Sequence, residues 1–99
     1  HGKNACTAWV NFDGTTTPPT IRDSFNVSDV VRTATGQFDV YFESGMDTLN
    51  YSLGGTGYSG RFMTISTPSL SKVHVSFSNH LGTILNTTYG FVQIFGGKD

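Results

Sequence analysis

The chain contains one cysteine, Cys6, among its 99 residues, so no disulfide can form within it. Charge is also scarce: Lys and Arg number six, Asp and Glu number seven, and charged residues make up 13% of the chain, about half the usual share. This balance provides no basic face, so we expect no nucleic-acid partner. No apolar run approaches the roughly 18 residues of a membrane span, and we expect no membrane insertion.

Helical periodicity is nearly absent as well, and alternation of apolar and polar residues dominates. The clearest example is a hairpin in which a tight turn at 34–36 leads into a strand with Phe38, Val40 and Phe42 on one face. The alternation predicts strands at 6–12, 21–27, 38–42, 49–53, 62–65, 73–77 and 91–95, with 30–32 leading into the 34–36 turn. Between them we expect loops, including a flexible one at 54–60.

Seven to eight short strands at regular spacing predict an all-β fold, a small antiparallel β-sandwich. We see no internal repeat and no boundary, so residues 1–99 are interpreted as one domain, a fragment of a longer chain. A chain of this length buries only about two-thirds of its unfolded surface. Without disulfides, self-association is the expected aid to stability.

Two loops, residues 54–60 and 79–89, are the candidate binding regions, because loops carry function more often than strands. Aromatic rings beside Asn, Ser and Thr can cover the apolar patch of a sugar while amides and hydroxyls pair with its hydroxyl groups. Arg61 can pair with an acidic sugar or a phosphate. The alternative is that both loops are solvated tips, with a tyrosine packed on the sandwich edge. The candidate receptor-binding residues are Tyr58, Arg61, Asn79, His80, Asn86 and Tyr89.

Trp9 is the only tryptophan, and it lies on the strand face opposite Val10 and Phe12. It could be a sugar-stacking platform, since an indole has an apolar face and an N–H donor. Tryptophan is highly buried on average, so we expect Trp9 to anchor a core or a subunit interface instead.

Catalytic and metal sites find little support. Asp39 and Glu43 share a strand face but lie about 13 Å apart at about 3.3 Å per residue, beyond the roughly 5–9.5 Å of glycosidase carboxylates. His74 has no second histidine two residues on, and no Cys, Asp or Glu stands at ligand spacing to it. We therefore expect no enzyme activity, no metal and no cofactor.

Four segments in order carry a resemblance to a known family. They are residues 8–14 (AWVNFDG), 21–28 (IRDSFNVS), 35–42 (TGQFDVYF) and 91–96 (FVQIFG). Together they resemble the C-terminal tip module of the tail fibres of tailed bacteriophages and prophages. Residues 46–51 (MDTLNY) are similar to a further segment of that module, although Gly45 stands where Ala is usual and no Pro follows Met46.

The resemblance implies a non-enzymatic, homotrimeric β-sandwich at the distal end of a tail fibre in the virion, made in the cytoplasm of the bacterial host. Such tips recognise lipopolysaccharide, capsule or an outer-membrane protein during host adsorption. Two alternatives stay open. One is a carbohydrate-binding module of a secreted glycan-degrading enzyme, which is usually monomeric and carries its aromatics as one planar strip. The other is a purely structural fibre segment without a ligand.

Overall fold

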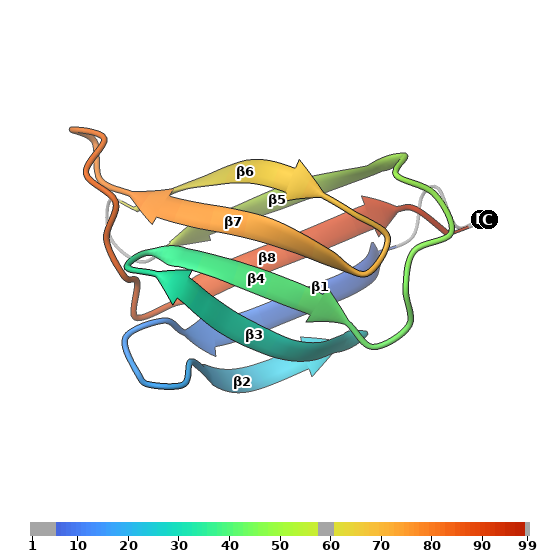
Figure 1. The fold of residues 1–99 in the computed structure, drawn as a ribbon, viewed down its shortest axis with the longest axis horizontal. Coiled ribbons are helices and arrows are strands. Elements are labelled where there is room, and N and C mark those ends of the chain that lie inside the picture. Colours follow the sequence, from blue (N-terminus) through green and yellow to red (C-terminus); the bar gives the residue numbers. More distant parts are fainter. Residues whose placement is uncertain (1–5, 58–60, 99) are drawn as a thin grey trace.

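The computed structural model describes residues 6–57 and 61–98, and eight strands account for most of them (Figure 1). They are β1 (Cys6–Asp13), β2 (Thr20–Phe25), β3 (Val27–Ala34), β4 (Gln37–Phe42), β5 (Tyr51–Gly57), β6 (Phe62–Pro68), β7 (Lys72–Ser78) and β8 (Gly90–Gly96). Sheet A has the order β2-β1-β8-β5 and sheet B the order β3-β4-β7-β6. All neighbouring strands are antiparallel. The two sheets stack face to face, which confirms the predicted all-β antiparallel sandwich.

The core lies between the sheets and follows the predicted alternation. Phe12 of sheet A meets Phe38 and Phe77 of sheet B edge to face, with ring centroids 5.1 and 6.1 Å away. Edge-to-face pairs of this kind add to the energy of burial because a positive ring edge meets a negative ring face. The aliphatic residues buried around them are Ala8, Val10, Val92 and Ile94 from sheet A and Val27, Val30, Val40, Val73 and Val75 from sheet B.

The predicted loop at 54–60 is wrong over residues 54–57, which belong to β5. Gly55 is needed because β5 runs close to its neighbours at this position. A Cβ on Gly55 would lie 2.3 Å from the Phe91 carbonyl oxygen and 2.7 Å from the Met63 sulfur. Glycine therefore allows a close backbone approach within a strand here, and does not mark a turn. Strand β6 is also longer than predicted and ends at Pro68, on an edge where proline is tolerated.

The chain crosses from sheet A to sheet B at Asn26, where the predicted strand 21–27 is interrupted. Asn26 has φ +56°, a left-handed value that asparagine adopts more readily than most residues. Its side-chain amide donates to the carbonyl oxygens of Thr7 (3.1 Å) and Ser44 (3.0 Å) and accepts from the Ser44 N–H (2.6 Å). The side chain thus ties both ends of the crossing to neighbouring segments.

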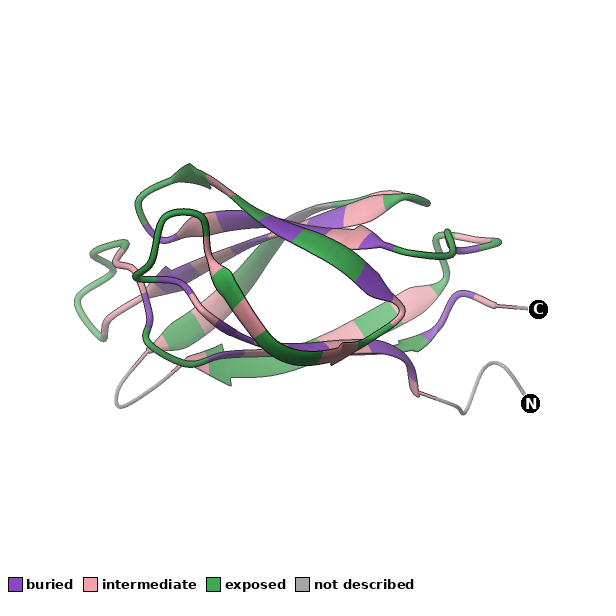
Figure 2. Cartoon of the chain, turned by 90° about the horizontal axis from the view of Figure 1, so that it is seen from below, coloured by how far each residue is buried: buried purple, intermediate pink, exposed green. Residues whose placement is uncertain are grey.

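The two ends of the sandwich differ. Strand β1 begins and β8 ends at one end, where Cys6 pairs with Phe95 (Figures 1 and 2). The β1–β2, β3–β4 and β7–β8 connections lie at the opposite end (Figure 1). We call this the loop end and define it by residues 14–19, 35–36, 61 and 79–89.

Candidate functional site

The loop end is built around the segment 84–89, and residues of the other connections form hydrogen bonds to this segment. The Asn86 side-chain oxygen accepts from the Gly36 N–H at 2.7 Å, and the Thr87 carbonyl accepts from the Gly14 N–H at 2.8 Å. Arg61 Nε donates to the Asn86 carbonyl at 3.4 Å. Thr87 is 1% exposed. The loop end is therefore one hydrogen-bonded unit that fixes the positions of its surface residues.

A turn at 79–83 projects from this unit. The Asn79 side-chain oxygen accepts from the N–H groups of Leu81 (2.9 Å) and Thr83 (3.0 Å). Gly82 has φ +83°, in the left-handed region that favours glycine. The turn presents three exposed side chains, His80, Leu81 and Thr83, and Leu81 is 77% exposed. Asn79 thus supports the turn that presents its neighbours.

The predicted binding residues do not form a single cluster. Arg61 and Asn86 meet within the loop end, and Asn79 and His80 lie at its projecting turn. Tyr89 packs on sheet A instead, with its ring stacked on Phe91 at 5.9 Å between centroids. Tyr58 lies outside the described residues. These six residues stay predictions as a receptor site.

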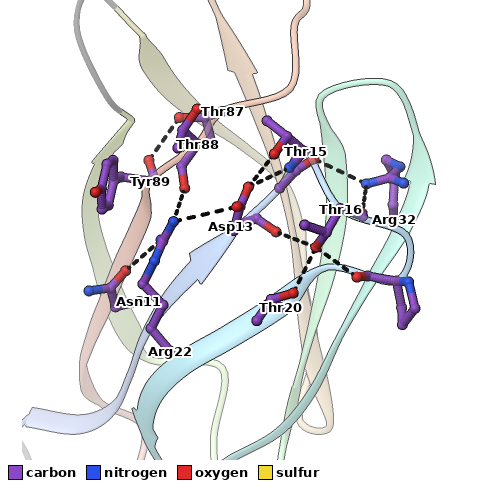
Figure 3. A network of polar contacts seen from close by, with 12 residues as sticks. Asn11, Asp13, Thr15, Thr16, Thr20, Arg22, Arg32, Thr87, Thr88 and Tyr89 are labelled. Atoms are coloured by element: carbon purple, nitrogen blue, oxygen red, sulfur yellow. Dashed lines mark hydrogen bonds and ion pairs between the residues drawn. The ribbon is translucent and has the colours of Figure 1, made fainter.

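Two arginines that sequence reasoning did not single out hold the loop end to the sheets (Figure 3). Arg22 donates to the Asn11 side-chain oxygen (3.1 Å) and the Thr88 carbonyl (2.6 Å). It also pairs with Asp13 (3.6 Å), and its guanidinium lies 4.1 Å from the Tyr89 ring centroid. The contact with Thr88 spans 66 residues of sequence, so no local pattern could reveal it.

The second arginine, Arg32, fixes the β1–β2 connection (Figure 3). Its guanidinium donates to the carbonyl oxygens of Gly14 (3.0 Å) and Thr16 (2.7 Å) and to the Thr17 hydroxyl (2.5 Å). Asp13, the last residue of β1, accepts hydrogen bonds from the hydroxyl and the N–H of Thr15. These bonds lower the pKa of Asp13, and the charge of Arg22 adds to the effect. This connection is therefore held from within by Asp13 and from β3 by Arg32.

The outer face of sheet A carries an aromatic surface. Trp9 is the direct neighbour of Phe25 on β2 and of Gln93 on β8, and Asn11 is the neighbour of Phe91. Phe25 is 53% exposed, and Trp9 is partly exposed and absent from the core. Trp9 therefore does not anchor the core of its own chain, and its expected alternative role, as an anchor in a subunit interface, stays a prediction. Alternation places Trp9 on the outer face of β1, but it does not show that Phe25 of β2 and Gln93 of β8 lie beside it.

The outer face of sheet B is charged. Asp39 is 8% exposed and accepts from Lys72 Nζ (3.1 Å), and its other oxygen lies 2.7 Å from His74 Nδ1. Burial raises the pKa of Asp39, but the hydrogen bonds from His74 and Lys72 outweigh it and leave the pKa below its usual value. This is a structural charge cluster on a sheet face, and His74 is a polar-face strand residue as predicted.

Over residues 6–57 and 61–98, no group of three or more His, Cys, Asp or Glu side chains is placed to hold a metal ion. The same residues include no helix long and apolar enough to cross a membrane. Comparisons of the chain with protein-family models, with curated proteins and with solved structures find no match.

Proposed function

We propose that this chain is the non-enzymatic receptor-binding tip of a bacteriophage tail fibre, which recognises lipopolysaccharide, capsule or an outer-membrane protein on bacteria. The observation that carries the proposal is the position of the loop end. It lies opposite the end where β1 begins and β8 ends. A fibre shaft joined at that end leaves the loop end free to meet a cell surface.

The geometry of the loop end suits recognition. Its connections are hydrogen-bonded to one another, so little conformational freedom is lost on binding. The turn at 79–83 projects His80 and Leu81 from this base. Three copies in one fibre would multiply a weak single contact through avidity.

Binding of labelled protein to a panel of bacterial strains, read by flow cytometry, tests the proposal. We expect Leu81→Ser to weaken binding to the recognised strains about tenfold, the effect of losing one buried apolar anchor. Leu70→Ser is the matched control, because Leu70 is also exposed (47%) but lies in the β6–β7 connection at the other end. Equal binding by the two variants, or no binding to any strain, contradicts the proposal.

One observation favours a second candidate, a carbohydrate-binding module of a glycan-degrading enzyme. The aromatics on the outer face of sheet A lie on neighbouring strands of one surface, and an aromatic strip of this kind is typical of such modules. The two candidates differ in symmetry, since the fibre tip is a homotrimer and the module a monomer.

A further inference from the structure

We infer that the outer face of sheet A is a binding site for a neutral oligosaccharide. Trp9 and Phe25 form its stacking surface, Phe91 extends this surface toward the loop end, where Tyr89 stacks on its ring, and Asn11 and Gln93 supply the polar contacts. The inference deepens the second candidate, the carbohydrate-binding module, and does not depend on the fibre-tip proposal.

The first observation is that these aromatics do not contribute to the interior. The core is complete between the sheets, and its aromatic members are Phe12, Phe38, Phe42 and Phe77. Trp9, Phe25 and Phe91 point the other way, on the strand positions that alternate with Val10 and Val92. An exposed apolar patch of this kind usually marks a binding surface.

The second observation is that polar side chains lie beside these aromatic rings. Asn11 lies between Asp23 and Phe91 in one row across the sheet, and Gln93 lies between Trp9 and Gly54 in the next. Asn11 uses its side-chain oxygen to accept from Arg22, which leaves its NH₂ group to donate to a ligand. Flat rings alternating with amides match a sugar, whose C–H face is apolar and whose rim carries hydroxyl groups.

Charge argues for a neutral ligand. Strands β5 and β8 contain no charged residue, and β1 contains only Asp13. The edge strand β2 adds Arg22, which is paired with Asp13, and Asp23, which lies beside Asn11 in the outer row. A polyanionic glycan would therefore meet the Asp23 carboxylate and a single cation that is already paired, whereas a neutral glycan loses no charge solvation there.

The shape of the face leaves a path for an extended ligand. Gly54 ends the row of Phe25, Trp9 and Gln93, and a Cβ at this position would meet no atom within 4 Å. Farther along β8, the face continues at Phe95 and Ser52 into a hollow of about 550 Å³, also lined by Asn50 and Lys98. The row is thus open at β5, where a side chain would otherwise close it.

Fluorescence of the full chain tests the site directly, because Trp9 is its only tryptophan. The probes are cellohexaose, maltohexaose and chitohexaose, with a polygalacturonate hexamer as the charged comparison. We expect at least one neutral hexaose to shift the Trp9 emission to shorter wavelength and to reduce acrylamide quenching at least twofold. The charged hexamer is expected to do neither at physiological salt.

Variants locate the effect. Phe25→Ser is expected to weaken the binding of the neutral hexaose about tenfold, which is the effect of losing one stacking contact. Its matched control is Phe62→Ser on β6 of the other sheet, with 57% exposure against 53% for Phe25, and binding should stay within twofold. Gly54→Leu fills open space, so it should keep the melting temperature and weaken binding at least tenfold.

Four results would overturn the inference: no response to any neutral hexaose, binding of the charged hexamer alone, equal loss in Phe25→Ser and Phe62→Ser, or an emission shift with protein concentration alone. The last result would mean that a second copy covers the face. The cell-binding assay with Leu81→Ser is read separately. Cell binding that survives while Trp9 fails to respond therefore rejects this site and leaves the fibre-tip proposal standing.

Discussion

Asn26 combines two properties that few residues offer together. Its backbone is left-handed at φ +56°, and its side chain makes three hydrogen bonds with Thr7 and Ser44. Asn26→Ala should lower the free energy of unfolding by about 2–3 kcal/mol, since it loses these bonds and strains the backbone. Asn26→Gly keeps the backbone conformation and should lose about 1 kcal/mol less. Chemical denaturation of both variants measures this difference, and equal losses would show that the backbone value carries no cost.

Asp39 gives the fold a dependence on pH. Its pKa in the folded state lies below the ordinary value of 3.8, so the folded state favours the carboxylate. The stabilisation is complete above the ordinary pKa and disappears as the pH falls through the lowered one. Asp39→Asn should therefore lower the free energy of unfolding by about 1 kcal/mol at pH 7. This corresponds to a melting temperature lower by about 4–8 °C.

The same comparison at low pH completes this test. Once the pH falls below the lowered pKa of Asp39, the wild-type carboxylate is protonated too, so the gap between the two melting temperatures should shrink. Glu43→Gln, which removes one exposed negative charge just after β4, is the control and should leave the melting temperature nearly unchanged at both pH values. A gap that stays constant as the wild-type protein is titrated from pH 7 to the acid end of its folded range would contradict the assigned role of Asp39.

At the scale of the element, the strands with one buried face were predictable from alternation. β1, β4, β7 and β8 each carry a buried apolar residue at every second position, and a period-2 pattern reports that directly. β5 was predicted only in part, because Gly54 and Gly55 have no side chain to show which face is buried. The close approach of β8 and Met63 requires glycine at Gly55, and this is a tertiary contact that the local sequence does not show.

The candidate site was less predictable than the strands. The loops at the loop end were placed correctly along the chain, but their mutual contacts join residues far apart in sequence, such as Gly36 with Asn86. The aromatic face of sheet A needs the order β2-β1-β8-β5 before Phe25, Trp9 and Gln93 become neighbours. Alternation gives the face of each strand, but strand order comes only from the assembled sheet.

For the whole molecule, the mass in solution distinguishes a trimeric fibre tip from a monomeric carbohydrate-binding module. The chain has a small core, no disulfide and exposed apolar side chains on sheet B as well, among them Phe62 (57%) and Ile65 (39%). Self-association that covers such residues would stabilise the folded chain.

We expect light scattering on a size-exclusion column to give three times the 10.7 kDa of one chain. Acrylamide quenching of Trp9 in that trimer should stay high, because the sugar site inferred on the outer face of sheet A has to remain accessible. A monomer would instead favour the carbohydrate-binding module, since a single copy could bind a sugar on sheet A without the avidity that a fibre tip needs.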